Sequence, residues 1–232
     1  LNVPAYKIAS FESTDHGLLR KVASTGKPII MSTGMATIKD IDESISVLRA
    51  AGVKQLAVLK CTSSYPAQPK DANVSGIRVL RDTWNIVPGL SDHTLGNEVA
   101  MAAVAMGACI IEKHIIIDRE CPTADAPFSM TGPEFQNLVQ SARIVREAIG
   151  NPHIAFGKTT AEGLSKKWRR SIFVVKDVKK GDKFVKGENV RSIRPAAGLH
   201  TRHWDLVLGS AATCDLEAGT PLDFHHLTPS TE

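Results

Sequence analysis

The sequence predicts a parallel α/β fold over residues 1–150, followed by a small β-rich domain. Short apolar runs alternate with longer helical patterns from residue 5 to about 150, an order typical of parallel βα units. Four of the five runs are almost continuously apolar, as expected of strands buried on both faces. After Gly150, short β-like runs are separated by Gly- and Lys-rich turns, which indicates a second domain.

The first region is predicted to contain five βα units. Strands are expected at Tyr6–Ser10, Pro28–Ser32, Leu56–Cys61, Ile86–Ser91 and Cys109–His114. Helices are expected at about Gly17–Ser24, Ile38–Ala51, Asp71–Asp82, Asn97–Met106 and Pro133–Ile149. Five units do not close an eight-stranded barrel, so a partial barrel and an open doubly wound sheet are both possible. No Gly-rich dinucleotide fingerprint or Walker P-loop follows any strand, which removes the main support for the open sheet.

Residues 151–168 are predicted to form a polar linker, and residues 169–232 the β-rich domain. Within that domain, β-like runs are expected at Ser171–Lys176, Lys183–Val185 and Val190–Arg194.

Length and composition favour a globular protein of 232 residues with a formal net charge of +4. No run of about 18 apolar residues and no signal-peptide pattern is found, so a cytoplasmic protein without a membrane segment is expected. The four cysteines show no metal-type spacing and are interpreted as reduced, partly buried thiols.

Positive charge is concentrated between Lys158 and Arg202, with thirteen Lys or Arg against four Asp or Glu. This pattern is compatible with a nucleic acid, an acidic partner, an anionic small substrate or simply a solvated surface. Charge alone does not choose among them.

Polar residues end each predicted strand, where the active sites of α/β barrels lie. They are Lys7, Ser10 and Glu12; Ser32 and Thr33; Cys61, Ser63 and Tyr65; Ser91, Asp92 and His93; and Glu112 and His114.

His93 and His114 end neighbouring predicted strands, so their imidazoles are expected at the same mouth. Two protein nitrogens leave other positions for water or substrate, which favours an open catalytic Mn²⁺ or Mg²⁺ over a structural zinc. A single histidine would more often be a hydrogen-bonded structural residue, but two at matching strand ends favour a metal site.

Ser10, Ser32 and Ser91 end three strands, where hydroxyls can hold phosphate oxygens, and Lys7 can neutralise a carboxylate or a phosphate. Each serine alone is also an ordinary residue at the end of a strand.

Several segments together resemble the sialic acid synthase family, and within it most closely the pseudaminic acid synthases. The resemblance spans nearly the whole chain, although no single motif would be specific. The segments are Lys7–Glu12, Ser32–Met35, Leu59–Cys61, Tyr65–Pro66, Gly89–Gly96, Ile111–His114, Arg170–Asp177, Arg194–Pro195 and Gly198–His200.

The resemblance implies a (β/α)₈ TIM barrel, whose first three units are absent here, followed by a small SAF, or antifreeze-like, domain. It also implies a domain-swapped homodimer in which the SAF domain covers the partner's barrel mouth. Because the sequence would lack the upstream units, we expect the 232-residue chain alone to be inactive.

Residue roles follow from the same resemblance. His93 and His114 are similar to the metal ligands, and Glu12 to an acid near the sugar aldehyde. Contacts to phosphoenolpyruvate are implied for Lys7, Ser10, Ser32 and Ser91, with Ser63 where sialic acid synthases often carry Asn. Sugar contacts are implied for Tyr65 and Asp125, and for Arg194 toward the partner's sugar.

The implied reaction condenses phosphoenolpyruvate with an open-chain 2,4-diacetamido hexose to give pseudaminic acid and phosphate. Lys60 and Ser63 depart from the pattern of N-acetylneuraminate synthases and lie beside the pocket, which leaves the identity of the sugar open. N-acetylneuraminate and legionaminate synthases are therefore kept as alternatives that differ in the sugar. A non-catalytic polyanion- or sugar-binding fragment is the alternative of another class. Nucleic acid is not an expected partner.

Overall fold

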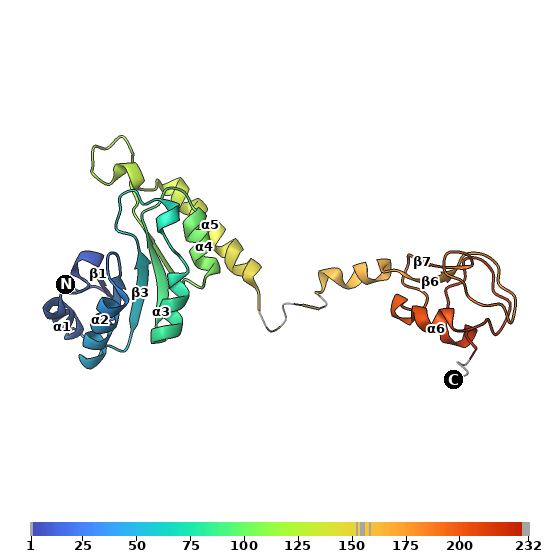
Figure 1. Cartoon of the computed structure of the whole chain (residues 1–232). Coiled ribbons are helices and arrows are strands. Elements are labelled where there is room, and N and C mark those ends of the chain that lie inside the picture. The colour runs from blue at the N-terminus through green and yellow to red at the C-terminus, as the bar shows by residue number, and fades with distance from the viewer. Residues whose placement is uncertain (1, 152, 154–155, 158, 229–232) are drawn as a thin grey trace. The chain divides into compact units, whose positions relative to one another are not determined.

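The computed structural model describes residues 2–151, 153, 156–157 and 159–228, which fall into two compact units, Leu1–Pro152 and His153–Glu232 (Figure 1). Each unit has its own sheet and its own core. Residues 152, 154, 155 and 158 of the predicted linker, and residues 229–232 of the predicted C-terminal domain, lie outside the described residues. Across the described ranges, no helix is both long enough and apolar enough to cross a membrane.

The first unit contains a parallel five-stranded sheet whose strand order follows the chain, as the sequence predicts. Its strands are β1 (Tyr6–Ile8), β2 (Ile29–Ser32), β3 (Leu56–Cys61), β4 (Val87–Asp92) and β5 (Ile110–Lys113). A doubly wound sheet reverses its strand order at a switch point. Because no reversal occurs here, the open-sheet alternative is excluded.

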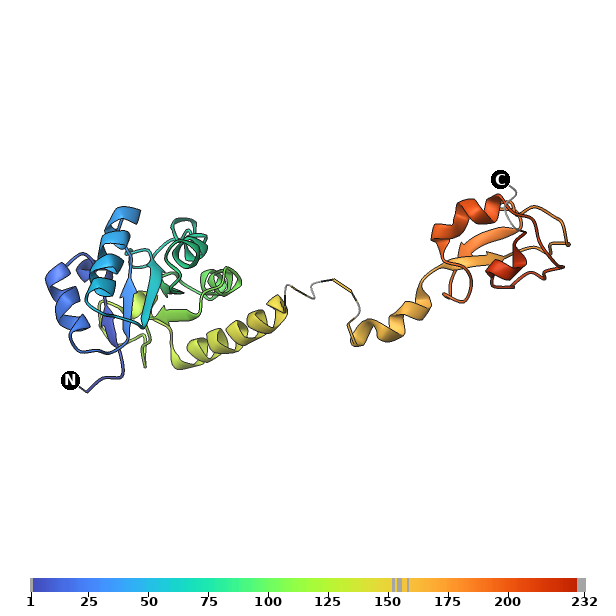
Figure 2. The ribbon, with the colours of Figure 1, turned by 90° about the horizontal axis from the view of Figure 1, so that it is seen from below.

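The sheet is curled, as the view from below shows (Figure 2). β1 and β5 are the two ends of the strand order, yet Lys7 Nζ on β1 lies 3.5 Å from Glu112 Oε1 on β5. These side chains can meet only because the strands between them bend around a concave face. The first unit is therefore part of a (β/α)₈-type barrel.

Five helices connect or follow the strands and lie on the outer side of the curled sheet (Figure 2). They are α1 (His16–Ala23), α2 (Ile38–Ala50), α3 (Gly76–Trp84), α4 (Glu98–Ala105) and α5 (Gly132–Ile149).

Local capping fixes where the helices begin. Asp15 accepts a hydrogen bond from the Leu18 amide at the start of α1. Capping boxes begin α2, where Thr37 pairs with Asp40, and α5, where Thr131 pairs with Glu134. Each box satisfies backbone N–H groups that have no partner inside the helix.

The helix predicted at Asp71–Asp82 is wrong in its first half. A 3₁₀ turn at Pro69–Asp71 is followed by α3 (Gly76–Trp84). Asn73 lies between them with a φ of 41°, in the left-handed region. That conformation interrupts a right-handed helix, so α3 begins only after it.

The main apolar core of the first unit lies between the sheet and its outer helices. It includes Leu19, Ile45 and Leu48 from helices and Ile8, Ile29, Met31 and Val58 from strands. Burying this face stabilises the unit through the apolar area removed from water. The strand ends on the concave side are thus left for polar residues.

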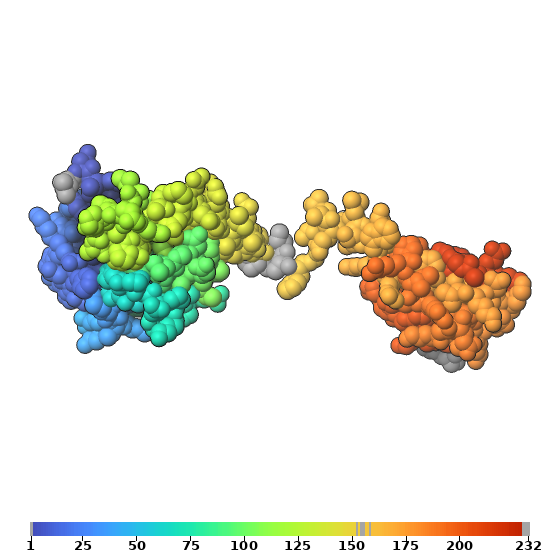
Figure 3. Space-filling view, turned by 90° about the horizontal axis from the view of Figure 1, so that it is seen from above, coloured from blue at the N-terminus to red at the C-terminus, as the bar shows by residue number. Residues whose placement is uncertain are grey.

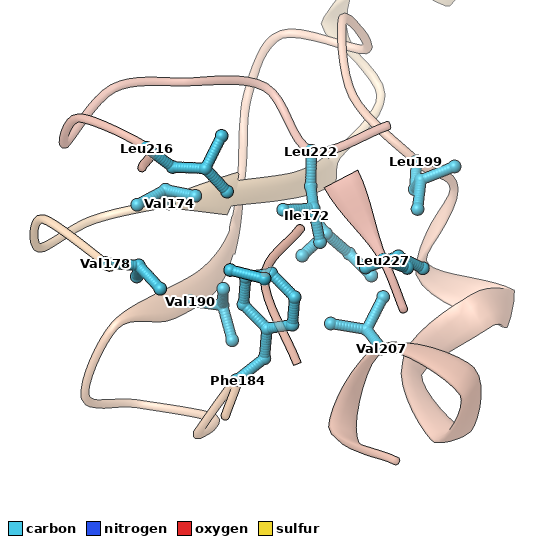
Figure 4. Packing of buried hydrophobic residues seen from close by; sticks show 11 residues of the cluster. Ile172, Val174, Val178, Phe184, Val190, Leu199, Val207, Leu216, Leu222 and Leu227 are labelled. Atoms are coloured by element: carbon cyan, nitrogen blue, oxygen red, sulfur yellow. The ribbon is translucent and has the colours of Figure 1, made fainter. Parts of the chain in front are cut away.

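The second unit is a small fold around a two-stranded antiparallel sheet, β6 (Ser171–Val174) and β7 (Val190–Ile193), with one short helix, α6 (Trp204–Leu208). Its core surrounds Phe184 (Figure 4). The other core residues drawn include Ile172, Val174, Val178, Val190, Leu199, Val207, Leu216, Leu222 and Leu227.

One strand predicted for this region needs correction. Lys183–Val185 forms no ladder strand, because the Asn189 side chain accepts from the Val185 amide and donates to the Lys183 carbonyl, which closes a turn. Part of the predicted linker, Ala161–Trp168, is a 3₁₀ helix that begins after hydrogen bonds between Thr159 and Glu162.

The prediction of partly buried cysteines is wrong in part, since Cys61 is buried but the other three free cysteines are exposed.

Candidate active site

The candidate site lies where β1 to β5 end, on the face seen from above in Figure 3, which carries the segment after β5 in yellow-green. β4 and β5 pair in register, with Ser91 beside Glu112 and Asp92 beside Lys113. Because side chains alternate along a strand, the pair 91/112 points to the opposite face from the pair 92/113. The following residues, His93 and His114, return to the face of the mouth.

The two histidines lie together, with ring centroids 5.3 Å apart. His93 Nδ1 lies 3.0 Å from the Thr62 carbonyl oxygen, and His114 Nδ1 lies 3.3 Å from Asp125 Oδ2. An Nδ1–H that donates to oxygen leaves the Nε2 lone pair of a neutral imidazole free.

This arrangement fits a divalent ion. Histidines that bind metals almost always donate the other ring N–H to a carboxylate or a carbonyl, which fixes the tautomer. Among the described residues, no group of three His, Cys, Asp or Glu side chains is placed to enclose an ion. His93 and His114 would therefore hold it through two nitrogens and leave positions for water or substrate oxygen.

Aromatic rings border the two imidazoles. Tyr65 lies 4.3 Å from His93 between ring centroids, and Phe128 lies 4.9 Å from His114. The Tyr65 and Phe128 rings are themselves 5.3 Å apart. Burial raises the pKa of Tyr65, which favours its neutral phenol. These rings form one apolar wall beside the two imidazoles.

Serine hydroxyls gather around the Gly34 backbone. The Gly34 amide donates to Ser10 Oγ at 2.9 Å. A Cβ built on Gly34 would lie 2.0 Å from Ser63 Oγ and 2.8 Å from Ser10 Oγ, so only glycine allows this close approach. Ser32 Oγ is buried and has no hydrogen-bond partner among the described residues. An unsatisfied buried hydroxyl is costly unless a ligand completes it.

The Glu112 carboxylate lies between Ser91 and Lys7, the two other residues predicted to contact phosphoenolpyruvate. Ser91 Oγ donates to Glu112 Oε1 at 2.7 Å, and Lys7 Nζ lies 3.5 Å from the same oxygen. Lys7 also donates to the Ile8 carbonyl at 3.1 Å. The Glu112 carboxylate thus holds the Lys7 ammonium and the Ser91 hydroxyl beside each other on the concave face.

Cys61 lies within the mouth and interacts with His93. Burial raises the pKa of the Cys61 thiol, but hydrogen bonds with His93, Ser10 and Ser63 lower it more, so the pKa falls to about 7. Burial lowers the pKa of His93, but contacts with Cys61 and the Thr62 carbonyl raise it above its usual value.

Three predicted residues take no part in the contacts described above around the two histidines and the serines. Glu12 ends the 3₁₀ turn Ser10–Glu12, and its side chain is exposed. Arg194 belongs to the second unit, where it is exposed and precedes a cis peptide bond to Pro195. Lys60 does not face the mouth: its stem lies against Gly76 at the start of α3, and its Nζ donates to the Cys61 carbonyl at 3.0 Å.

Sequence reasoning missed Gly34 and Phe128 at the mouth, and Lys113 behind it. Gly34 acts through its missing side chain, and Phe128 comes from a loop, so neither shows a pattern. Lys113 carried a signal, because it is a charged residue inside an apolar strand beside a histidine.

A partial (β/α)₈ barrel with a polar mouth and a separate small β-rich unit defines the class of protein. Residues 1–153 match the model of the NeuB family, and residues 169–228 match the SAF domain. The chain therefore belongs to the NeuB family, and the predicted resemblance to sialic acid synthases is confirmed.

Known relatives are similar along most of the chain. The pseudaminic acid synthase of Helicobacter pylori is 38% identical over 222 residues, which cover 96% of this chain and 65% of that protein. The N,N'-diacetyllegionaminic acid synthase of Campylobacter jejuni is 35% identical over 215 residues, which cover 92% of this chain and 64% of that protein.

Among solved structures, the spore coat polysaccharide biosynthesis protein SpsE of Bacillus subtilis superposes with a TM-score of 0.60 at 33% identity. The match covers 98% of this chain and 68% of that structure. The chain spans about 65% of the length of the first of these relatives.

Proposed function

We propose that these residues form part of the active site of a nonulosonic acid synthase. The enzyme would condense phosphoenolpyruvate with an open-chain 2,4-diacetamido hexose to give pseudaminic acid and phosphate. One observation carries the proposal: two imidazoles, each with Nδ1 beside an oxygen acceptor, lie with ring centroids 5.3 Å apart at a mouth lined by serine hydroxyls and Lys7. N-acetylneuraminate and legionaminate synthases are alternatives that differ only in the sugar.

The anion would bind on the serine side of the mouth. The hydroxyls of Ser10, Ser32 and Ser63 supply neutral donors around Gly34, while Lys7 supplies positive charge. Hydrogen bonds in which one partner is charged are roughly twice as strong as neutral ones. This side therefore suits the phosphate and carboxylate of phosphoenolpyruvate.

The sugar would bind on the aromatic side, against Tyr65 and Asp125. A divalent ion held by His93 and His114, Mn²⁺ or Mg²⁺, would polarise the sugar's aldehyde oxygen. The side chains on both sides of the mouth would orient the two substrates so that C3 of phosphoenolpyruvate faces the aldehyde carbon.

The proposed bond changes use these residues. The π electrons of the C2–C3 double bond of phosphoenolpyruvate attack the aldehyde carbon, which forms the new C–C bond and leaves a cationic C2. The aldehyde oxygen becomes an alkoxide, which takes up the proton that Glu12 removes from the attacking water. Water deprotonated by Glu12 adds to C2, and the tetrahedral intermediate expels phosphate. Lys7, Ser10, Ser32 and Ser91 would stabilise the charge on the leaving phosphate.

The family resemblance extends the proposal to a domain-swapped homodimer, in which Arg194 of one SAF domain reaches the sugar of the partner. Sedimentation analysis would report the assembly, and a monomer at all concentrations would oppose this part.

Manganese binding tests the site directly. Electron paramagnetic resonance reports free Mn²⁺ during titration of the chain, its H93A and H114A variants, and H16A, a control on α1. We expect both site variants to lose binding and the control to keep it, with circular dichroism showing that all remain folded. Unchanged Mn²⁺ binding in both site variants would refute the assignment.

Sugar identity needs a separate assay. In a preparation with phosphate-releasing activity, the release rate with phosphoenolpyruvate would be compared between N-acetylmannosamine and 2,4-diacetamido hexoses. Faster release with a diacetamido hexose is expected, and preference for N-acetylmannosamine would favour the N-acetylneuraminate alternative.

A further inference from the structure

Asp92 and Lys113 form a buried ion pair directly behind the two imidazoles. Each residue immediately precedes one of the histidines, and the two are partners in the β4–β5 register. Lys113 Nζ lies 2.9 Å from Asp92 Oδ2, and the side chains of Lys113 and Asp92 are 1% and 2% exposed. The pair therefore joins the two strand ends that carry His93 and His114, on the face opposite the mouth.

The pair also fixes the loop that follows β4. Besides Asp92, Lys113 Nζ donates to the carbonyl oxygens of Thr94 at 2.7 Å and Gly96 at 2.9 Å, so all three ammonium hydrogens are used. Asp92 Oδ1 accepts from the Thr94 amide at 2.9 Å and from its hydroxyl at 2.8 Å. His93 thus lies between two residues whose positions are both fixed.

The His93 and His114 backbones are held from the other side as well. The His93 carbonyl accepts from the Ala67 amide at 2.9 Å, and the His114 carbonyl accepts from the Met130 amide at 2.9 Å. The imidazoles therefore stand on backbone that has little freedom to shift. Behind the mouth, the two histidine-bearing segments are joined by the Asp92–Lys113 ion pair and by the hydrogen bonds from Lys113 to the Thr94 and Gly96 carbonyls.

Stability alone does not explain such a pair. Replacing a buried ion pair by residues without charge is often neutral or stabilising, because the charges must be removed from water. A pair that contributes little to stability but specifies one geometry suits a place where two ligands must keep a fixed separation.

We propose that Asp92 and Lys113 are positioning residues that set the separation and orientation of the two imidazoles for binding a divalent ion. The inference rests on the proposed metal site of His93 and His114. Neither residue touches the ion; they act through the strand ends. Loss of the pair should therefore weaken ion binding while the unit stays folded.

The test uses the full 232-residue chain and Mn²⁺ as the probe. The main variant is D92N/K113M, in which Asn keeps an oxygen for the two Thr94 hydrogen bonds and Met keeps much of the lysine stem. D92N alone is the second variant, should the double variant fail to fold. K39M is the matched control, because it removes a lysine from an exposed ion pair with Glu43.

Two measurements separate this inference from the proposed function. Mn²⁺ titration should show binding weakened by about 10-fold to 100-fold in D92N/K113M, as for loss of other groups that orient metal ligands, and no change in K39M. Long-range ¹H–¹⁵N spectra without metal should show altered resonances of both His93 and His114 in the double variant only.

The outcomes are distinct. Wild-type Mn²⁺ affinity and unchanged imidazole spectra in folded D92N/K113M would overturn the positioning role, even if H93A abolishes binding and so upholds the metal site. Undiminished Mn²⁺ binding in H93A and H114A would instead remove the proposed metal site. Weakened binding with altered spectra in D92N/K113M, and neither effect in K39M, supports the inference.

Discussion

Removing Lys113 alone should destabilise the first unit more than removing both charges. In K113M, Asp92 stays buried at 2% side-chain exposure without its cation. Breaking a buried pair in this way costs about 3–5 kcal/mol. We expect about 3 kcal/mol, at the lower end, because Asp92 Oδ1 keeps two hydrogen bonds from Thr94.

The double variant D92N/K113M should recover most of this loss. Asn carries no charge and still accepts from Thr94, so no uncompensated ion remains. The residual cost is the Thr94 carbonyl, which loses its donor inside the protein, and an unsatisfied buried group costs about 1–3 kcal/mol. We therefore expect the double variant to lie about 1–2 kcal/mol below the wild type.

Urea unfolding followed by tryptophan fluorescence measures both values. In a W168F/W204F background, Trp84 is the remaining tryptophan, and because it is buried in the first unit it reports that unit separately. Equal slopes against urea would show that the variants unfold the same surface. Equal loss of stability in K113M and D92N/K113M would refute the reasoning, since the uncompensated charge could not then be its cause.

Three further predictions concern single contacts. D125A should weaken Mn²⁺ binding by about tenfold, because His114 loses the carboxylate 3.3 Å from its Nδ1. D125N, which keeps an oxygen there, should lose less, and equal titrations for all three chains would oppose this. G34A should displace the Ser63 hydroxyl and weaken phosphoenolpyruvate binding in calorimetry by roughly 10-fold to 100-fold, the effect of losing one hydrogen bond to a charged group, whereas G132A, where a Cβ meets nothing, should bind normally. Backbone and side-chain hydrogen bonds lower the pKa of Glu134, so its contribution to stability is present above the unfolded-state pKa and is lost as pH falls through the folded-state pKa. In E134Q, the urea midpoint of unfolding should therefore depend less on pH below about pH 5 than in the wild type, and parallel plots of midpoint against pH for the two proteins would contradict this.

The positions of the strand ends could be predicted from the sequence, because apolar runs of parallel strands end in polar residues at one edge. This reasoning located His93 and His114 on adjacent strands, and their rings do lie together. The strand pattern did not predict that the two edges of the sheet approach each other. That expectation came from the family resemblance, because the curl of a sheet depends on packing that no local pattern encodes. The contact between Lys7 and Glu112 supplies that evidence from the structure.

Distances and partners could not be predicted. From a strand segment such as Glu112–Lys113–His114, one can predict that successive side chains point to opposite faces of the sheet. One cannot predict which of the three side chains has a buried partner. The α3 start was missed because Asn73 tolerates a left-handed backbone that most residues avoid. In the sequence Ser32 is an ordinary strand end, and it is distinguished by a buried Oγ that finds no hydrogen-bond partner in the part of the chain that the structure describes.

Lys60 and Ser63, which the resemblance predicts to differ from N-acetylneuraminate synthases, point in different directions. Lys60 points to the outer side, toward α3, where burial lowers its pKa. Ser63 points into the mouth, close to Gly34 and 3.8 Å from Cys61 Sγ. A residue can select a substrate only through a contact that differs between substrates. In the proposed reaction, discrimination at these two positions therefore belongs to the short hydroxyl at 63, which leaves more room than the larger amide of asparagine, and not to the charge at 60.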